Sequence, residues 1–421
     1  MIMGRCIRVL FVVVLFTIRP AAAETLLLQA DQMLDVDSGK LIVPANVVVE
    51  GNHIVAINPE TAPSVDRTIA LPGMTLLPGF MDLHTHITDD LEGNWVYRNV
   101  EEGPIDDALL GVKYARMTLM TGFTTIRDVG AAGFSDVALM RAIDKGIIDG
   151  PRIIPAAHSI GTTGGHCDVT GYAPGILTRG IEEGVADGPD EIVKAIRYQT
   201  KYGAKTIKIC ATAGVLSYED SVGAQQYSDL ELRAAVAEAR LQGMKIAAHA
   251  HGTEGIIAAS NAGVDSIEHG SLLTDEAVAV LKKNGTYLVP TLYQWFVPVE
   301  LPPLLHEKNE YIKERISESV RKALKAGVKF AFGTDAGAGP HGRSGEEFTA
   351  LVEHGMSPLE AIRTATVNAA DLMDIEDRGR IKTGLLADIV AVAGNPLENI
   401  RLLEDVKFVM KDGEVYKAPG K

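Results

Sequence analysis

Eight short apolar runs, separated by segments of helical periodicity, constrain the fold of this chain more than any other feature of its sequence. Strands that alternate with helices form βα units, and such units pair into a parallel sheet. Eight of them close into a (β/α)8 TIM-like barrel, whose functional site lies at the carboxyl ends of the strands. The sequence therefore predicts an α/β protein with barrel strands at Thr75–Leu83, Thr124–Asp128, Arg152–Ala156, Thr206–Cys210, Lys245–Ala248, Ser266–Ile267, Tyr287–Pro290 and Lys329–Phe332.

Both ends of the chain have a different pattern, with short strands and tight turns. Asn46–Glu50 and His53–Ile57 flank Gly51-Asn52, which is a β-hairpin signal, and Asp388–Val392 is one of several similar runs near the C-terminus. We expect the two ends to pair into one small β-sandwich. The predicted domains are a composite sandwich of residues 24–78 and 381–421 and a barrel of residues 79–380.

Three of the expected helices carry explicit start signals. Ser228 and Ser357 each precede a glutamate by three residues, which is the spacing of a capping box. Thr274 precedes two acidic residues, and Gly285 follows the last periodic residue of the same segment. These signals predict helix starts at residues 228, 274 and 357.

The first 23 residues have the pattern of a secretory signal peptide. Arg5 and Arg8 precede the apolar stretch Val9–Ile18, and Ala21–Ala23 offers a small-residue cleavage site. The stretch is shorter than the roughly 20 residues that span a bilayer. We therefore expect an exported protein, periplasmic or secreted, with no membrane partner after processing.

The net charge excludes some classes of partner, and the cysteine content limits the possible disulfides. The formal net charge of −15 opposes binding to nucleic acid and to anionic membranes, but it says little about a small-molecule substrate. Cys167 and Cys210 remain after removal of the signal peptide. Export permits a disulfide, but the sequence does not bring these cysteines together, and Cys210 lies in a strand pattern typical of a core residue.

Polar residues with metal-binding side chains end several of the expected strands. Only one residue separates His84 from His86, and alternate strand residues share a face, so both imidazoles point to one place. In a barrel, the later candidates would converge with them on one cavity. Imidazole and carboxylate ligands suit Zn²⁺ or a similar divalent ion, and the later candidates are Lys208, His249, His251, His269 and Asp335.

The segments around these residues match a known family in order and in sequence. They are PGFMDLHTH, TTIRDVG, TIKICATAG, AAHAHG, SIEHG, FGTDAG and GLLADIVAV, and they extend over residues 75–392. With them the chain resembles the amidohydrolase superfamily. The resemblance is to the imidazolonepropionase-related branch, which includes exported Xaa-Pro and Xaa-Arg/Lys dipeptidases and the ochratoxin-hydrolysing amidase.

The resemblance implies a metal-dependent hydrolase barrel with two zinc or other divalent ions per chain. His84, His86 and Asp335 would hold the more buried ion, and His249 and His269 the more exposed one. Lys208 would bridge both as its carbamate, formed with CO₂, because a carboxylated lysine is an anion and a free ammonium is repelled by cations. The alternative for Lys208 is an interior lysine paired with an acidic neighbour. His251 competes with His249 as a ligand, but the resemblance favours His249, so we expect His251 either to lie behind the ligands or to face the substrate.

The implied activity is dipeptidase- or carboxypeptidase-like hydrolysis of the amide bond to a C-terminal amino acid. The substrate would be a dipeptide or an N-acyl-L-amino acid, a class that includes ochratoxin A. A hydroxide bridging the two ions would attack the carbonyl, and Asp335 would pass its proton to the departing amine. Relatives often form homo-oligomers, so the resemblance allows that assembly.

The expected substrate contacts lie in loops after the strands. In relatives a T-G-G-H-x-D segment places a histidine against the substrate, which here is His166, a catalytic and substrate-binding candidate; the alternative is a solvated loop histidine. Candidates for carboxylate recognition are Tyr218, Tyr227, Tyr293 and Arg343, although tyrosines in such loops also serve packing. Residues 340–344 depart from the pattern of the relatives, which leaves the specificity open.

Two other functions fit parts of the same pattern. A hydrolase of cyclic amides, similar to imidazolonepropionase, would use the same scaffold, but mononuclear enzymes of that kind lack a bridging lysine such as Lys208. A non-catalytic exported solute-binding protein would need no open metal position. A closed structural zinc site typically includes cysteine ligands, and only Cys167 and Cys210 remain for one.

Overall fold

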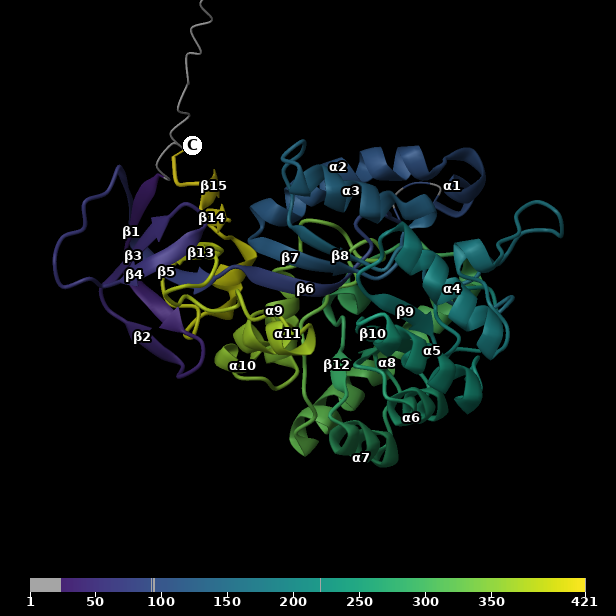
Figure 1. The fold of residues 1–421 in the computed structure, drawn as a ribbon. Coiled ribbons are helices and arrows are strands. Elements are labelled where there is room, and N and C mark those ends of the chain that lie inside the picture. Colours follow the sequence, from purple (N-terminus) through teal and green to yellow (C-terminus); the bar gives the residue numbers. More distant parts are fainter. Residues whose placement is uncertain (1–23, 92, 94, 220, 421) are drawn as a thin grey trace, which may run out of the picture.

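Strands from both ends of the chain form one mixed sheet in the computed structural model (Figure 1). The structure describes residues 24–91, 93, 95–219 and 221–420, so the expected signal peptide at 1–23 lies outside the described residues. The sheet has eight strands in the order β15-β14-β13-β5-β1-β3-β4, with β2 paired to β1. They are β1 (Thr25–Asp35), β2 (Lys40–Ile42), β3 (Ala45–Glu50), β4 (His53–Ile57), β5 (Arg67–Pro78), β13 (Ile389–Ala393), β14 (Phe408–Lys411) and β15 (Glu414–Lys417).

The expected pairing of the two chain ends is present in this sheet. β13 pairs antiparallel with β5, and β3 and β4 form the predicted hairpin, with Glu50 opposite His53. The apolar face of the mixed sheet packs around Leu28, Leu71 and Phe408, all of them buried. The hydrogen bonds define a single sheet, and a two-layered sandwich remains a prediction.

Seven parallel strands build the second part of the molecule. β6, β7 and β8 form one sheet in that order, and β9 to β12 form another in the order β12-β11-β10-β9. The strands are β6 (Phe80–Thr85), β7 (Phe123–Asp128), β8 (Arg152–Pro155), β9 (Ile207–Cys210), β10 (Ile246–Ala250), β11 (Ser266–His269) and β12 (Tyr287–Val289). The α/β class expected from the sequence is therefore confirmed.

Two of the expected strands differ from the observed ones. The run Thr75–Leu83 is divided at Gly79: its first part ends β5 of the mixed sheet, and its second part is β6. A Cβ on Gly79 would lie 2.4 Å from Thr124 Oγ1, so the chain passes β7 too closely there for any side chain. Lys329–Phe332 is not a regular strand, because its backbone accepts from Leu288 N on β12 and then from Leu83 N on β6.

Backbone hydrogen bonds also connect the two parallel sheets. Ile160, after β8, donates to Lys208 O at 2.9 Å and accepts from Cys210 N at 2.8 Å. On the other side, Lys329 accepts from Leu288 N at 2.8 Å and Phe332 accepts from Leu83 N at 2.9 Å. The segments that follow β8 and β12 therefore link each sheet to the other.

Helices cover the outer side of the parallel strands (Figure 1). They are α1 (Trp95–Glu101), α2 (Pro104–Met120), α3 (Ser135–Asp144), α4 (Pro189–Tyr202), α5 (Asp229–Leu241), α6 (Thr253–Ala262), α7 (Asp275–Asn284), α8 (Pro303–Ala326), α9 (Glu346–Glu353), α10 (Pro358–Thr364) and α11 (Val367–Leu372). Short 3₁₀ turns lie at Ala132–Phe134, Ile181–Glu183, Tyr293–Phe296 and Ile400–Glu404. The predicted starts are confirmed: Ser228, Thr274 and Ser357 each accept the expected backbone N–H.

In the part of the chain that the structure describes, each helix is too short or too polar to cross a lipid bilayer.

Aromatic side chains pack together beside the starts of β6 and β7. Phe80, Phe123, Phe332 and Phe348 are fully buried, and their ring centroids lie 4.5 to 5.6 Å apart in four contacting pairs. Phe80 and Phe123 are the first residues of β6 and β7, and Phe348 comes from α9, so the cluster joins these strands to that helix.

Candidate metal centre and active-site cavity

Two histidines and an aspartate meet where β6 ends. The Nε2 atoms of His84 and His86 lie 3.4 Å and 3.6 Å from Oδ1 of Asp335. Burial by itself would raise the pKa of the Asp335 carboxyl, but the surrounding histidines hold it well below its usual range. Burial lowers the pKa of His86 to about 4. An aspartate carboxylate beside two imidazoles is a ligand set for a divalent ion.

Three further histidines come from β10 and β11. The ring nitrogens of His249, His251 and His269 that could hold an ion lie within 4.8 Å of one another. The His269 ring centroid is 4.9 Å from that of His84, so the two groups border one space. Burial lowers the pKa of all three, that of His251 to about 3. They are therefore neutral, which is the form that binds metal.

Lys208 on β9 lies in the same buried space. Burial lowers the pKa of its amine to about 8, an effect that Glu268 and Asp335 partly oppose. Glu268 and Asp335 are therefore the acidic neighbours of Lys208, although within the described residues neither lies within ion-pair distance of its amine. An amine with a lowered pKa has a larger neutral fraction, and the neutral amine is the form that combines with CO₂.

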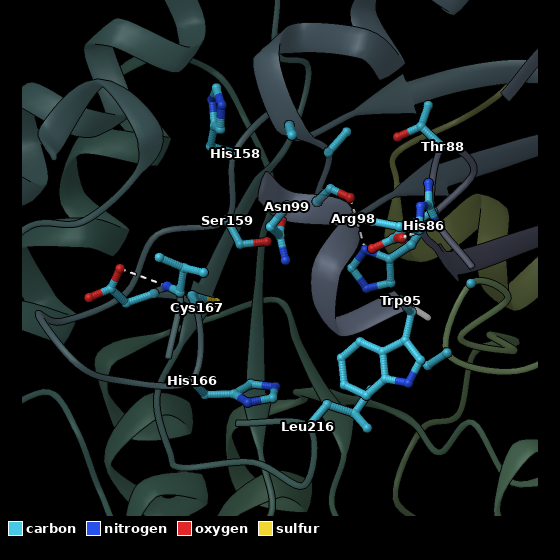
Figure 2. A pocket seen from close by; sticks show the side chains of 18 of the residues that line it. His86, Thr88, Trp95, Arg98, Asn99, His158, Ser159, His166, Cys167 and Leu216 are labelled. Atoms are coloured by element: carbon cyan, nitrogen blue, oxygen red, sulfur yellow. Dashed lines mark hydrogen bonds and ion pairs between the residues drawn. The ribbon is translucent and has the colours of Figure 1, made fainter. Parts of the chain in front are cut away.

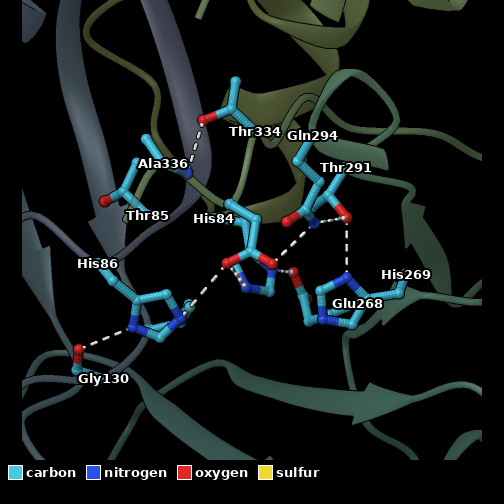
Figure 3. A network of polar contacts seen from close by, with 12 residues as sticks. His84, Thr85, His86, Gly130, Glu268, His269, Thr291, Gln294, Thr334 and Ala336 are labelled. Carbon is cyan, nitrogen blue, oxygen red and sulfur yellow. Dashed lines mark hydrogen bonds and ion pairs between the residues drawn. The ribbon is translucent and has the colours of Figure 1, made fainter. Parts of the chain in front are cut away.

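The protein fixes the orientation of four of these imidazoles through Nδ1, and Figure 3 shows this for His84, His86 and His269. Each Nδ1 is hydrogen-bonded to a protein oxygen, so the opposite nitrogen, Nε2, is left for the centre. The pairs are His84 with Glu268 Oε2 at 2.7 Å, His86 with Gly130 O at 2.9 Å, His251 with Ser271 Oγ at 2.9 Å and His269 with Thr291 Oγ1 at 2.8 Å.

The donor set fits a metal ion. Within the described residues, Nε2 of His249 is buried and has no hydrogen-bond partner. A buried polar atom without a partner is costly, and a metal ion removes that cost. Together with the preset orientation of the other rings, this atom indicates that the residues are arranged to hold divalent ions.

Two residues that sequence reasoning missed hold the ligands in place. Glu268 accepts from Arg127 Nη2 at 2.9 Å and from His84 Nδ1, and it is fully buried. Burial by itself would raise the Glu268 pKa, but Arg127 and His84 outweigh it and lower that pKa to about 2. Gln294 donates to Asp335 Oδ2 at 2.8 Å. The one available signal was the alternation in β11, where Ser266 and Glu268 share a face.

The backbone is unusual at two of the candidate ligands, His269 at the end of β11 and Asp335 after the run Lys329–Phe332. His269 has φ of 71° and Asp335 has φ of 58°, both in the left-handed region. For residues with a side chain this region costs roughly 1–2 kcal/mol each. At His269 it breaks the strand alternation, which allows adjacent Glu268 and His269 both to point inward (Figure 3). Such conformations concentrate at functional sites.

The candidate ligands apart from His251 line a cavity of about 420 Å³. His251, which was expected to face the substrate or to lie behind the ligands, lies outside the lining of this cavity. Figure 2 shows the His166 ring projecting into it, together with Trp95 and Leu216. The His166 ring stacks on the ring of His249 with centroids 4.1 Å apart. The lining also includes His84, His86, Lys208, His249, His269, Asp335, Tyr218, Leu177 and Arg179.

Three of the expected carboxylate-binding residues are placed elsewhere. Tyr227 is buried and donates to Ala186 O, and Tyr293 is buried and donates to Pro340 O. Arg343 pairs with Glu346 within α9 and its preceding loop. None of the three lines the cavity, whereas Tyr218 does. Both tyrosine hydroxyls are thus used within the protein, which agrees with the alternative that these tyrosines serve packing.

Cys167 and Cys210 form a disulfide, with their Cα atoms 5.8 Å apart. Cys210 is buried, as its strand pattern predicts, and it is also bonded to Cys167, a pairing that the sequence left open. The sequence could not show the pairing, because it depends on how the loop that contains Cys167 folds back over β9.

Comparison with known proteins places this site in a family. The model described as "Amidohydrolase family" matches residues 75–417. Ochratoxinase from Aspergillus niger is 33% identical over 373 residues, which are 82% of this chain and 76% of that protein. Imidazolonepropionase from Cutibacterium acnes is 25% identical over 388 residues, which are 87% of this chain and 88% of that protein.

A solved structure agrees with these sequence matches. The crystal structure of a Xaa-Pro dipeptidase with bound methionine in the active site superposes with a TM-score of 0.88. The two sequences are 39% identical, and the match covers 94% of this chain and 100% of the dipeptidase chain. These findings confirm the resemblance inferred from the strand-end motifs. The chain belongs to the amidohydrolase family.

Proposed function

We propose that this protein is a binuclear metal-dependent amidohydrolase that cleaves the amide bond to a C-terminal amino acid. The observation that carries the proposal is the arrangement of two ligand groups and Lys208 around one cavity of about 420 Å³. Its relatives include an ochratoxinase and a Xaa-Pro dipeptidase. A dipeptide and an N-acyl-L-amino acid present the same amide and carboxylate, so either is a candidate substrate, as is ochratoxin A.

Six side chains would hold the two ions. His84, His86 and Asp335 would bind one, His249 and His269 the other, and Lys208 both, as its carbamate. Bound Zn²⁺ or another divalent ion supplies ionised water near neutral pH and polarises the amide carbonyl. His251 belongs to the same buried group, and its Nδ1 is held by Ser271, so it is an alternative ligand.

Asp335 is the residue that moves the proton. Its carboxylate is ionised, and Gln294 holds Oδ2, which leaves Oδ1 beside His84 and His86. A carboxylate in this place can take a proton from the attacking water and deliver it to the departing amine. Proton delivery matters because an amide nitrogen is a poor leaving group until it is protonated.

Substrate recognition would come from the loops over the cavity. The His166 ring lies over His249, and its Nδ1 is hydrogen-bonded with Ser217 Oγ, which leaves Nε2 for the substrate. Arg179 lines the cavity, and its guanidinium donates to Asn99 Oδ1 over a long distance of 3.4 Å. We assign carboxylate recognition to Arg179 in place of Arg343.

The architecture and location follow the same proposal. The parallel sheets would close into the expected (β/α)8 barrel over residues 79–380, with Lys329–Phe332 as the closing segment. Residues 24–78 and 381–421 would form the composite domain. The Cys167–Cys210 disulfide supports export, because disulfides persist in oxidising compartments.

The test is a substrate screen with metal-loaded protein. Xaa-Pro, Xaa-Arg and Xaa-Phe dipeptides, N-acyl amino acids and cyclic amides are compared by release of free amine. We expect turnover of compounds with a free C-terminal carboxylate and none after the Asp335→Asn substitution. Turnover of cyclic amides alone would favour the imidazolonepropionase-like alternative, and no turnover at all would favour a binding protein.

A further inference from the structure

The Cys167–Cys210 disulfide joins two parts of the proposed active site. Cys167 directly follows His166, and Cys210 ends β9, two residues after Lys208. Both cysteines line the cavity. A covalent bond therefore connects the loop that presents His166 with the strand that presents Lys208. Figure 2 shows Cys167 and His166 on that loop.

Around His166 itself this loop contacts other loops, and further along the chain Tyr172 donates to Val96 O on α1. Its two ends are held together where Gly161 donates to Gly184 O and accepts from Ala186 N. Between them, the His166 backbone donates to Gln226 Oε1 at 3.1 Å, and its ring is hydrogen-bonded with Ser217 Oγ at 2.7 Å. Gln226 and Ser217 both lie in the segment after β9, outside any strand or helix.

Among the described residues, the disulfide is the covalent link from this loop to β9, in addition to the backbone hydrogen bonds that Ile160 forms with β9 just before the loop begins. The fit is close, because a Cβ on Gly161 would lie 2.6 Å from Cys167 Cβ. The ligands of β6, β10 and β11 do not depend on it, since backbone ladders position those strands.

We propose that the Cys167–Cys210 disulfide positions His166 over His249, and that its reduction frees the His166 loop while the metal ligands stay in place. The proposal rests on the proposed function for the role of His166 in substrate binding. Reduction adds two electrons and two protons and leaves two thiols. Cys167 and Cys210 are accordingly positioning residues, which act through His166, and an exported enzyme of this kind is most active when oxidised.

Three variants of the full metal-loaded chain test the tether: Cys167→Ala, Cys210→Ala and the double variant. Since either single change already breaks the bond, all three should lose kcat/KM equally, by roughly 10- to 100-fold, as expected for a misplaced binding group. Metal content should remain at the wild-type value. Treatment with a phosphine reductant should reproduce this loss in the wild type and have no effect on the double variant. Thr163→Val, which removes an exposed hydrogen bond to Asp187 from the same loop, is the matched control and should change kcat/KM less than twofold.

The specific readout is the dependence on His166. His166→Ala should lower kcat/KM strongly in the oxidised protein and hardly at all in the double cysteine variant. An equal loss in both backgrounds would overturn the proposal, because a generally destabilised protein would still use His166. Unequal losses in the two single variants would also overturn it, since they would indicate local packing.

Hydrogen–deuterium exchange tests the tether without any substrate. Peptides covering residues 162–184 should exchange faster after reduction, while peptides covering β6, β10 and β11 should not change. Unchanged exchange at residues 162–184 contradicts the proposal. If the wild type hydrolyses none of the screened amides but the exchange result holds, the proposed function fails and the tether stands.

Discussion

Replacing Glu268 with glutamine removes one charge from a fully buried network and keeps its shape. Glu268 bonds Arg127 and His84, and none of the three side chains is more than 1% exposed. Removing one partner of a buried ion pair costs about 3–5 kcal/mol, because the other charge stays buried. Arg127 keeps its bonds to Leu83 O and Ser266 Oγ, so we expect Glu268→Gln to cost about 3 kcal/mol of unfolding free energy, the lower end of that range.

The same substitution should weaken metal binding. Glu268 holds the Nδ1 side of His84, and loss of such a partner typically costs about 10- to 100-fold in metal affinity or activity. Urea unfolding of metal-free protein measures the first effect, and zinc titration the second.

Glu238→Gln on α5 is the matched control. It makes the same chemical change in a pair with Arg197, whose side chain is 62% exposed, so solvent screening leaves little to lose. If Glu268→Gln unfolds and binds zinc as Glu238→Gln does, the assignment of Glu268 as the support of His84 is refuted.

Three further substitutions test single features. Ser357→Ala removes the N-cap of α10 and should cost about 1 kcal/mol in urea unfolding; no change would mean that the capping box contributes nothing. Gln294→Leu removes the bond to Asp335 Oδ2 and should lower kcat/KM about 10- to 100-fold with metal content retained; wild-type kinetics would contradict the role given to Gln294. Burial raises the pKa of Glu347 to about 8, against 4.5 in the unfolded chain, so the native state keeps a proton that the unfolded state releases. The free energy of unfolding should then fall as pH rises from about 4.5 to 8, and it should fall less in Glu347→Gln. Urea unfolding at pH 5 and pH 8 measures both changes, and an equal decrease in the wild type and the variant would contradict this role of Glu347.

Strand ends and helix starts are the parts of this structure that the sequence predicts well. His84-Thr85-His86 follows a run of apolar residues, so period-two alternation suffices to bring both rings to one side. Ser228 and Ser357 act through contacts only three residues away, which depend little on the tertiary fold. Signals of this kind are local and therefore readable.

The features that were missed depend on distant contacts or on the backbone. Glu268 looks like an ordinary strand residue until Arg127 and His84 are placed beside it. The left-handed backbone at His269 and Asp335 has no signature in residue type. Lys329–Phe332 has the composition of a strand, but its hydrogen bonds change from one neighbour to the other too quickly for a regular ladder. The two cysteines of the disulfide are 43 residues apart in sequence, so their pairing depends on the path of the chain between them.

The most direct test of the central claim is anomalous diffraction at the zinc absorption edge from crystals of the zinc-loaded protein. The account predicts two peaks per chain, one beside His84, His86 and Asp335 and one beside His249 and His269, with additional density on Lys208 Nζ. A single peak, peaks outside the cavity, or an unmodified Lys208 directed away from both groups would contradict it.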